Sequence, residues 1–271
     1  FVAVFIATFV AQCMVFCRQT DFPKSDMFPH EKLHVYGKAL GFVAAATAFS
    51  AAWDKRHAVV DQFGRASESL ILNLADGARL RSGPSKLRAL DYSIGSCLEC
   101  AACLDIARIK SLLGKVEPHQ EKQRLCEIAR MLIGLRKAWE DWRANEDSPP
   151  SGAGPLDHPP EPLFHHEALE VYRAALELME WFVSLPGASA LSCRLSRQID
   201  EGATSIVLNI AEGNGRYSEL DHRRFLDVAE GSAVKVAAYL DLAVQRRTLC
   251  QAECDPGKKL LGRIVAMRSR M

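Results

Sequence analysis

Hydrophobic positions recur at spacings of three and four along most of the chain, a pattern that predicts amphipathic α-helices. After residue 164 this pattern forms four separate stripes. Their members are Leu169, Tyr172, Leu176, Met179 and Val183 in the first helix; Leu195, Ile199, Ala203, Ile206 and Ile210 in the second; Phe225, Val228, Ser232, Val236, Tyr239 and Ala243 in the third; and Leu261, Ile264 and Met267 in the fourth. Four such helices with short turns and no strand signal predict an antiparallel up-down-up-down bundle.

Local signals predict where these helices begin and end. Pro186 and Gly187 are expected to end the first helix, and Gly213 is expected to close the second in the left-handed conformation. The third helix is expected to open at Ser218, whose hydroxyl can cap free N–H groups together with Asp221. The fourth is expected to follow the turn at residues 254–257.

The same pattern occurs twice, with an offset of 136 residues. Residues 28–40 align with 164–176, and residues 69–77 align with 205–213 without a gap. Such an offset indicates a duplication. The predicted fold is therefore all-α: two tandem four-helix bundles over residues 28–143 and 164–271. Six of the twelve prolines lie between them, which predicts an extended linker over residues 144–163.

The N-terminal residues have a different character. Residues 1–17 are apolar apart from Thr8 and Gln12, and this run is shorter than the roughly 20 residues that a membrane span needs. It also lacks the basic region and cleavage site of a secretory signal. Because Met27 directly precedes the first helical pattern, residues 1–27 are interpreted as an extension outside the functional fold. The alternative is a membrane anchor formed by residues 1–17.

Composition places the chain among ordinary globular proteins. Of its 271 residues 48% are hydrophobic and 25% charged, and the formal net charge is only +1. Strong long-range attraction to phosphates is therefore excluded, and a nucleic-acid role would have to depend on local patches. Residues 28–143 carry 18 Lys and Arg against 13 Asp and Glu, whereas residues 164–271 carry 14 of each. The odd number of cysteines, nine, favours reduced thiols and a cytoplasmic location.

One segment carries a family resemblance. Residues 209–216 (NIAEGNGR), Ser218 and residues 224–232 (RFLDVAEGS) together fix a helix end, a turn and the next helix start. This motif resembles the small four-helix-bundle family encoded in intervening sequences of bacterial ribosomal RNA genes, which is similar to accessory proteins of diversity-generating retroelements. The resemblance implies a non-enzymatic bundle that tends to form ring-like oligomers. No cofactor and no small-molecule substrate are expected. In the retroelement branch the resemblance implies nucleic acid and reverse transcriptase as partners.

The motif residues allow two interpretations. They are Asn209, Glu212, Gly213, Arg216 and Ser218 in the second copy, and Asn73, Asp76 and Gly77 in the first. They either brace the turn between two helices or form an oligomer contact. Bracing is favoured, because Glu212 and Gly213 are expected at the helix end where the turn must be fixed.

Basic residues gather in the second copy. The candidates for nucleic-acid contact are Arg223, Arg224, Arg246, Arg247, Lys258, Lys259, Arg263, Arg268 and Arg270. Such clusters can neutralise phosphates without reading base sequence. Solvated helix faces have the same composition, so the pattern alone does not decide between the two.

A zinc-protease pattern occurs once, at residues 30–34 (HEKLH). His30 and His34 on one helical face could share a zinc ion, with Glu31 activating its water. However, Leu40 stands where a third histidine would be expected, and the second copy has Glu170 in place of His34. A zinc hydrolase is therefore only a distant alternative, and no metal is expected.

Four cysteines of the first copy, Cys97, Cys100, Cys103 and Cys126, offer a second metal-like pattern. The counterparts of the first three are Ala233, Val236 and Tyr239, which favours packing positions in a core.

No phosphate loop, nucleophile triad or complete metal set is present. The chain is therefore interpreted as a non-catalytic scaffold or assembly protein that associates through its bundle faces. The alternative is a nucleic-acid-binding accessory protein of a retroelement or another mobile element, acting with a reverse transcriptase.

Overall fold

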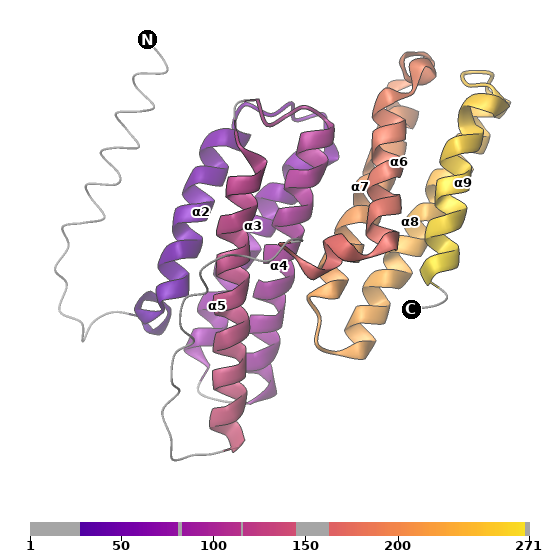
Figure 1. Cartoon of the computed structure of the whole chain (residues 1–271). Helices are drawn as coiled ribbons and strands as arrows, with labels where there is room; N and C mark the ends of the chain where they lie inside the picture. The colour runs from indigo at the N-terminus through magenta and orange to yellow at the C-terminus, as the bar shows by residue number, and fades with distance from the viewer. Residues whose placement is uncertain (1–27, 81–82, 115, 145–162, 269–271) are drawn as a thin grey trace, which may run out of the picture.

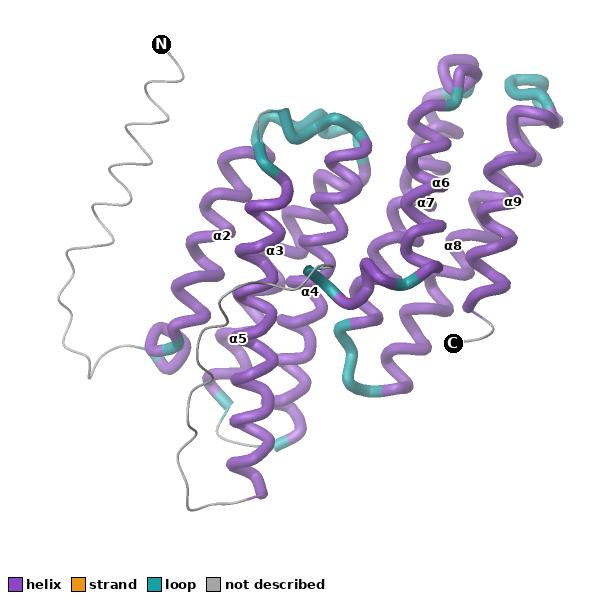
Figure 2. Tube along the Cα trace, viewed as in Figure 1, coloured by secondary structure: helices purple, strands orange, loops and turns teal. Residues whose placement is uncertain are grey.

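The computed structural model describes residues 28–80, 83–114, 116–144 and 163–268, and these residues form helices and turns without a strand (Figure 1, Figure 2). The first copy consists of η1 (Pro29–Lys32), α2 (His34–Ser50), α3 (Ala58–Arg79), α4 (Pro84–Ile109) and α5 (Pro118–Ala144). The second consists of η2 (His165–Ala168), α6 (Glu170–Ser184), η3 (Pro186–Ala190), α7 (Cys193–Asn214), α8 (Glu219–Gln245) and α9 (Gln251–Arg268). The prediction of two tandem all-α bundles is confirmed.

Each copy is a four-sided bundle in which every long helix packs against two neighbours. In the first copy α2 contacts α3 and α5, and α4 contacts the same two helices from the opposite corner. In the second copy α6 and α8 each contact α7 and α9 in the same way. The two bundles stand side by side, with α4 of the first against α6 and α7 of the second (Figure 1).

Two of the predicted helix boundaries are confirmed and two are wrong. α6 ends at Ser184, before Pro186, and the Ser218 hydroxyl accepts a hydrogen bond from the Asp221 N–H at 3.3 Å. Gly213 does not take the left-handed conformation, because α7 continues to Asn214. A Cβ at Gly213 would lie 2.9 Å from the Phe225 Cβ, so this glycine serves the close packing of α7 on α8.

The fourth helix of the second copy begins earlier than predicted, at Gln251, and includes Pro256. The Glu253 carboxylate accepts a hydrogen bond from the Cys250 N–H at 2.7 Å, which holds the helix start in place. Gly257 lies against the Trp181 ring, where a Cβ would come within 2.4 Å of the ring. Tertiary packing therefore fixes this helix despite its proline.

The predicted stripe of α8 is right at Val236 and Ala243, which are buried, and wrong at Val228. Val228, assigned to the core, is 46% exposed. The other buried residues each lie one position after a predicted one: Leu226, Ala229, Ala233 and Leu240. The reason is that α8 carries apolar residues on two faces, and only one of them covers the core of its own bundle. Val228, Val234 and Leu242 remain exposed on the other.

Two segments named in the sequence analysis, residues 1–27 and most of the linker at 145–162, lie outside the described residues. Within the described part of the chain, no helix is both long enough and apolar enough to cross a membrane.

Candidate assembly interface

The two copies meet through different helices. α4 buries 17 of its 26 residues, whereas its equivalent α8 buries only 6 of 27. The difference arises because α4 is covered by its own bundle on one side and by α6 and α7 on the other. On α7 the additional buried residues lie on one stripe, which consists of Asp200, Thr204, Val207, Leu208 and Ala211. The contact is therefore formed by unlike faces of two equivalent bundles.

Charged side chains from both copies meet at one end of this contact. Lys122 Nζ lies 2.9 Å from both carboxylate oxygens of Asp105 in the first copy. In the second copy Tyr172 donates its hydroxyl hydrogen to Asp105 Oδ2 at 2.9 Å, and Glu167 forms an ion pair with Lys122. Burial, followed by the charge of Asp105, raises the pKa of Tyr172 well above its usual value. The hydroxyl therefore remains a hydrogen-bond donor.

His166 lies beside this cluster without a hydrogen-bond partner. Its ring is fully buried, stacks on Phe164 at 5.6 Å between centroids and meets the edge of Tyr172 at 4.7 Å. Neither ring nitrogen is paired. Burial, with a smaller contribution from Lys122, lowers the pKa of His166 to about 3. The imidazole is therefore neutral in the folded protein at neutral pH.

The middle of the contact depends on the close approach of Arg216 to α4. Its guanidinium forms an ion pair with Glu212 and lies 4.4 Å from the centre of the Tyr92 ring. A Cβ at Gly95 would come within 3.1 Å of Arg216 Cζ, a tight contact that would require the Arg216 side chain to shift. Glu99 is also close, and burial together with the Glu212 charge raises the pKa of Glu99 to about 8.

A second buried ion pair joins the copies at the C-terminal end of α4, five residues beyond Asp105. Lys110 pairs with Asp200, and their side chains are only 2% and 11% exposed. The backbone N–H of Ala58 donates a second hydrogen bond to Asp200 Oδ2 at 3.1 Å. Burial lowers the pKa of Lys110, while Asp200 opposes that shift. The lysine charge is thus held in an apolar contact by one carboxylate.

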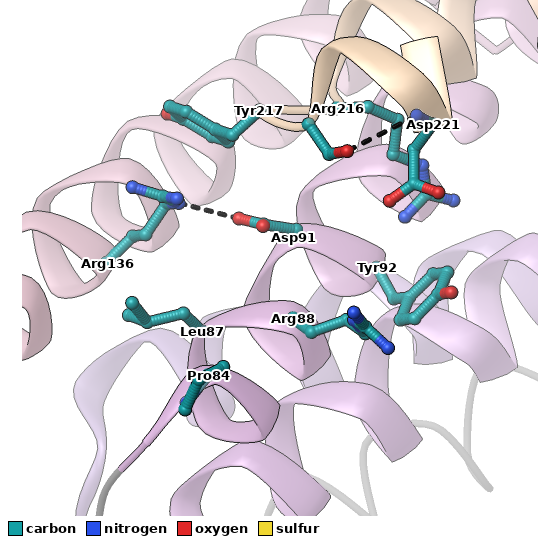
Figure 3. Close-up of a pocket in the computed structure, with 10 residues that line it drawn as sticks. Pro84, Leu87, Arg88, Asp91, Tyr92, Arg136, Arg216, Tyr217 and Asp221 are labelled. Atoms are coloured by element: carbon teal, nitrogen blue, oxygen red, sulfur yellow. Dashed lines mark hydrogen bonds and ion pairs between the residues drawn. The ribbon is translucent and has the colours of Figure 1, made fainter. Parts of the chain in front are cut away.

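A pocket of about 290 Å³ opens between the copies next to this contact (Figure 3). Arg136 Nε donates to Asp91 Oδ1 at 2.6 Å, and the Arg136 guanidinium lies 3.7 Å from the centre of the Tyr217 ring. The lining residues are Pro84, Leu87, Arg88, Asp91, Tyr92, Arg136, Arg216, Tyr217, Ser218 and Asp221. Of the three arginines that line the pocket, Arg136 and Arg216 pair with carboxylates. The charged residues of the pocket therefore serve mainly to join the two bundles.

The equivalent faces at the two ends of the chain are exposed. Leu208 is buried at 4% exposure in the contact, whereas its equivalent Leu72 on α3 is 67% exposed. In the same way Leu98 on α4 is 7% exposed, and its equivalent Val234 on α8 is 58% exposed. Each bundle therefore keeps one uncovered face that is equivalent to a face used in the internal contact.

The predicted motif residues occupy two kinds of position. Asn209 and Asn73 donate to the carbonyl oxygens of Ser205 and Ser69 at 2.7 and 2.8 Å, so they brace their own helices. The hydroxyl of each serine also forms a hydrogen bond with a serine hydroxyl on the next helix, Ser205 with Ser232 at 2.9 Å and Ser69 with Ser96 at 2.7 Å. Asp76 pairs with Arg79, and Gly77 is buried against α4 and α5. Glu212 and Arg216 instead face the first copy, and Ser218 caps α8.

Three of the candidate nucleic-acid residues are paired with carboxylates. Arg223 contacts Glu219 at 2.7 Å, Arg263 contacts Glu177 at 3.1 Å, and Lys258 pairs with Asp241. Arg224, Arg246, Arg247 and Lys259 are exposed. The side chain of Arg268 and all of Arg270 lie outside the described residues.

The geometry assumed for the zinc pattern is wrong. His30 lies in η1 and His34 begins α2, and Leu33 between them is extended with ψ 120°. The two histidines therefore do not share one helical face. The Glu31 carboxylate accepts a hydrogen bond from the Phe28 N–H at 2.7 Å.

The cysteines of α4 lie in the core, as the packing interpretation predicts. Cys97, Cys100 and Cys103 are fully buried, and the Cys97 thiol donates to the Leu125 carbonyl at 3.3 Å. Burial raises the pKa of Cys100 and Cys103 well above the usual range. Across the described ranges, no group of three or more His, Cys, Asp and Glu residues is arranged to hold a metal ion.

Sequence reasoning missed the polar cluster around Asp105 and Lys122. A signal was present, because the offset of 136 residues places Asp241 and Lys258 at the equivalent positions. An acid and a lysine that recur together in both copies of a duplicated fold are candidates for an ion pair. Lys258 was instead grouped with the candidate phosphate contacts.

Fold and interface together define a class: a tandem four-helix-bundle protein whose copies join through unlike faces. The profile of the 23S rRNA-intervening sequence protein family matches residues 31–134 and again residues 167–270. The chain therefore belongs to this family and carries its domain twice, which confirms the resemblance seen in the sequence. No curated protein and no solved structure matches the chain significantly.

Proposed function

We propose that this protein is a non-catalytic scaffold whose chains associate by repeating the contact that joins its two copies. The observation that carries the proposal is the unlike pairing of faces in that contact. The first copy uses mainly α4, with part of α3 against α7, and the second uses α6 and α7. The equivalent faces, on α8 and on α2 with α3, are left uncovered, and a second chain offers the complement to each of them.

Exposed apolar residues support this proposal. Leu72, Val234 and Leu242 are 67%, 58% and 42% exposed, while their equivalents in the internal contact are 4%, 7% and 0% exposed. Apolar side chains gathered on a surface are typical of sites for protein association. Burying them as their equivalents are buried would stabilise a chain-to-chain contact by the hydrophobic effect.

The consequence for assembly follows from symmetry. An interface between unlike faces leaves one unused face at each end of any chain of subunits. Repetition of such a contact either closes into a ring or continues as a filament. The tandem duplication makes each polypeptide two subunits of that arrangement.

The charge arrangement favours a scaffold over a phosphate-binding accessory protein. Arg223, Lys258 and Arg263 form ion pairs with carboxylates of the same copy. A phosphate would have to compete with those carboxylates, and the second copy has no net charge to attract it.

Light scattering after size-exclusion chromatography tests the proposal. The wild-type chain is expected to form a defined oligomer at micromolar concentration. Leu72→Glu and Val234→Glu should each weaken it strongly, because either places a carboxylate in an apolar contact. Ile133→Glu is a matched control, since Ile133 is 45% exposed on α5 and outside both faces. A wild-type chain that stays monomeric at every concentration would contradict the proposal.

A further inference from the structure

The polar cluster at the internal contact has an uncovered counterpart. Lys258 pairs with Asp241 in the second copy as Lys122 pairs with Asp105 in the first. Lys122 and Asp105 are each 12% exposed, because the second copy covers them. Lys258 and Asp241 are 30% and 60% exposed. We name the uncovered pair the docking site.

The group that would cover this pair is also present, at the other end of the chain. The internal cluster is covered by the segment that contains Phe164, His166, Glu167 and Tyr172. Its equivalent, residues 28–36, has the same local structure and is named the docking turn. The ring centroids of the first and third residues of each segment lie 5.6 Å apart in both copies. The histidine and tyrosine centroids lie 4.7 Å apart in both.

The acidic residue is also equivalent in the two segments, Glu31 in the docking turn and Glu167 in the internal cluster. The Glu31 carboxylate accepts the Phe28 N–H at 2.7 Å, just as Glu167 accepts the Phe164 N–H at 3.3 Å. Glu167 also reaches Lys122 across the internal contact. The first copy therefore presents a preformed turn whose Phe28 is 66% exposed, with the acid and the tyrosine already in place. Little ordering would be needed for it to bind.

Charges elsewhere on the two uncovered faces are complementary. Inside the chain Glu99 on α4 lies close enough to Glu212 on α7 to raise its pKa, a like-charge approach. Their equivalents on the uncovered faces are Lys235 on α8 and Asp76 on α3, which carry opposite charges. The equivalent contact between chains would thus place a lysine opposite a carboxylate where the internal contact brings two carboxylates together, although Glu212 and Asp76 each also pair with an arginine of their own helix end. This charge match favours a second copy of this chain as the occupant.

We propose that the docking site of one chain binds the docking turn of another, with Tyr36 donating to Asp241 and Glu31 pairing with Lys258. This inference rests on the proposed function and specifies its register. It also predicts direction, because the first copy of one chain must bind the second copy of the next. The apolar faces supply the area of the contact, and the polar residues select the partner.

Charge reversal with rescue tests this register. Lys258→Glu alone and Glu31→Lys alone each bring like charges together in the contact. Either should raise the dissociation constant of the assembly about tenfold or more. The double variant Glu31→Lys/Lys258→Glu restores opposite charges and should regain most of the lost affinity. Sedimentation velocity across a dilution series measures all three.

The rescue separates the contact from local damage. Glu31→Lys also removes a hydrogen bond to Phe28, and Lys258→Glu also faces Asp241, but neither local loss is repaired by the other substitution. Tyr36→Phe, which removes only the hydroxyl, should weaken assembly without changing helicity. Glu167→Lys is the matched control in the internal cluster. It should lower the denaturation midpoint at every protein concentration.

The outcomes distinguish this register from the scaffold proposal. If Leu72→Glu dissociates the oligomer while the charge-reversed single variants assemble like wild type, the scaffold stands and the register is wrong. If the single variants are weakened and the double variant is no better than the worse of them, the register is also wrong. Recovery in the double variant supports it.

Discussion

Removing the carboxylate of Asp200 should destabilise the whole chain, because it leaves the Lys110 ammonium without its partner in the contact between the copies. The two side chains are only 11% and 2% exposed, so water cannot replace the lost interaction. Breaking a buried pair by removing one partner costs about 3–5 kcal/mol of unfolding free energy. Asp200→Ala also removes the acceptor of the Ala58 N–H.

Urea denaturation followed by circular dichroism measures this loss. For a urea dependence of about 2–3 kcal/mol per molar, a loss of about 3–5 kcal/mol lowers the midpoint by roughly 1–2.5 M. Glu201→Ala is the matched control, since Glu201 is the next residue on α7 and pairs with Arg197 in partly exposed positions, 40% and 71%. It should cost about 0–1 kcal/mol.

A third variant separates the two contributions to the result. Lys110→Met/Asp200→Leu removes both charges and should lie within about 2 kcal/mol of wild type, because no uncompensated charge remains. The reasoning fails if Asp200→Ala costs no more than Glu201→Ala. It also fails if the double variant is as unstable as Asp200→Ala, because the loss would then not come from an unpaired lysine.

Three further predictions concern the same contact. The pKa of His166 is about 3 in the folded protein, against about 6.5 for an unperturbed histidine in the unfolded chain. The free energy of unfolding should therefore fall as the pH drops below 6.5, by about 2 kcal/mol at pH 5. His166→Phe should remove that loss, which urea titrations at pH 5 and 7.5 would measure. A pH dependence identical to wild type in that variant would refute the assignment. Glu99 gives stability the opposite pH dependence, because its pKa of about 8 means that stability falls as the pH rises from about 4.5 to 8. Glu99→Gln should flatten this slope in thermal melts. An unchanged slope would show that another group is responsible. Gly95→Ala should lower the free energy of unfolding by about 1–3 kcal/mol, because the added Cβ meets Arg216. At the equivalent position Gly231→Ala, where the Cβ meets nothing within 4 Å, should raise the free energy of unfolding of the monomer by about 0.5–1 kcal/mol. Equal effects of the two substitutions in denaturant titrations would contradict the close packing at Gly95.

Much of the fold could be predicted because it depends on local signals. Helical periodicity, the serine cap at Ser218 and the proline after α6 act within a few residues. The duplication was visible in the offset of 136 residues. The role of Gly213 was not predictable in the same way, because its reason is the Phe225 side chain on another helix rather than a backbone conformation.

The contact between the copies could not be predicted, because equivalent residues occupy different environments in the two copies. Tyr172 is fully buried in the contact, while its equivalent Tyr36 is only partly buried. Leu208 and Leu72 are the same residue type at equivalent positions, yet only one is covered. A periodicity argument treats each bundle as isolated, so it also placed Val228 in the core. It cannot separate the two apolar faces of α8, of which only one covers the core of its own bundle.

The central claim is that chains join through unlike faces, and mixing two defective variants tests it most directly. Leu72→Glu leaves the α8 face intact, and Val234→Glu leaves the α3 face intact, so each variant alone should be monomeric. When they are mixed in equal amounts, one intact contact becomes available and native mass spectrometry should show a complex with one chain of each kind and nothing larger. A mixture that stays monomeric, or a dimer formed by either variant alone, would contradict assembly through unlike faces.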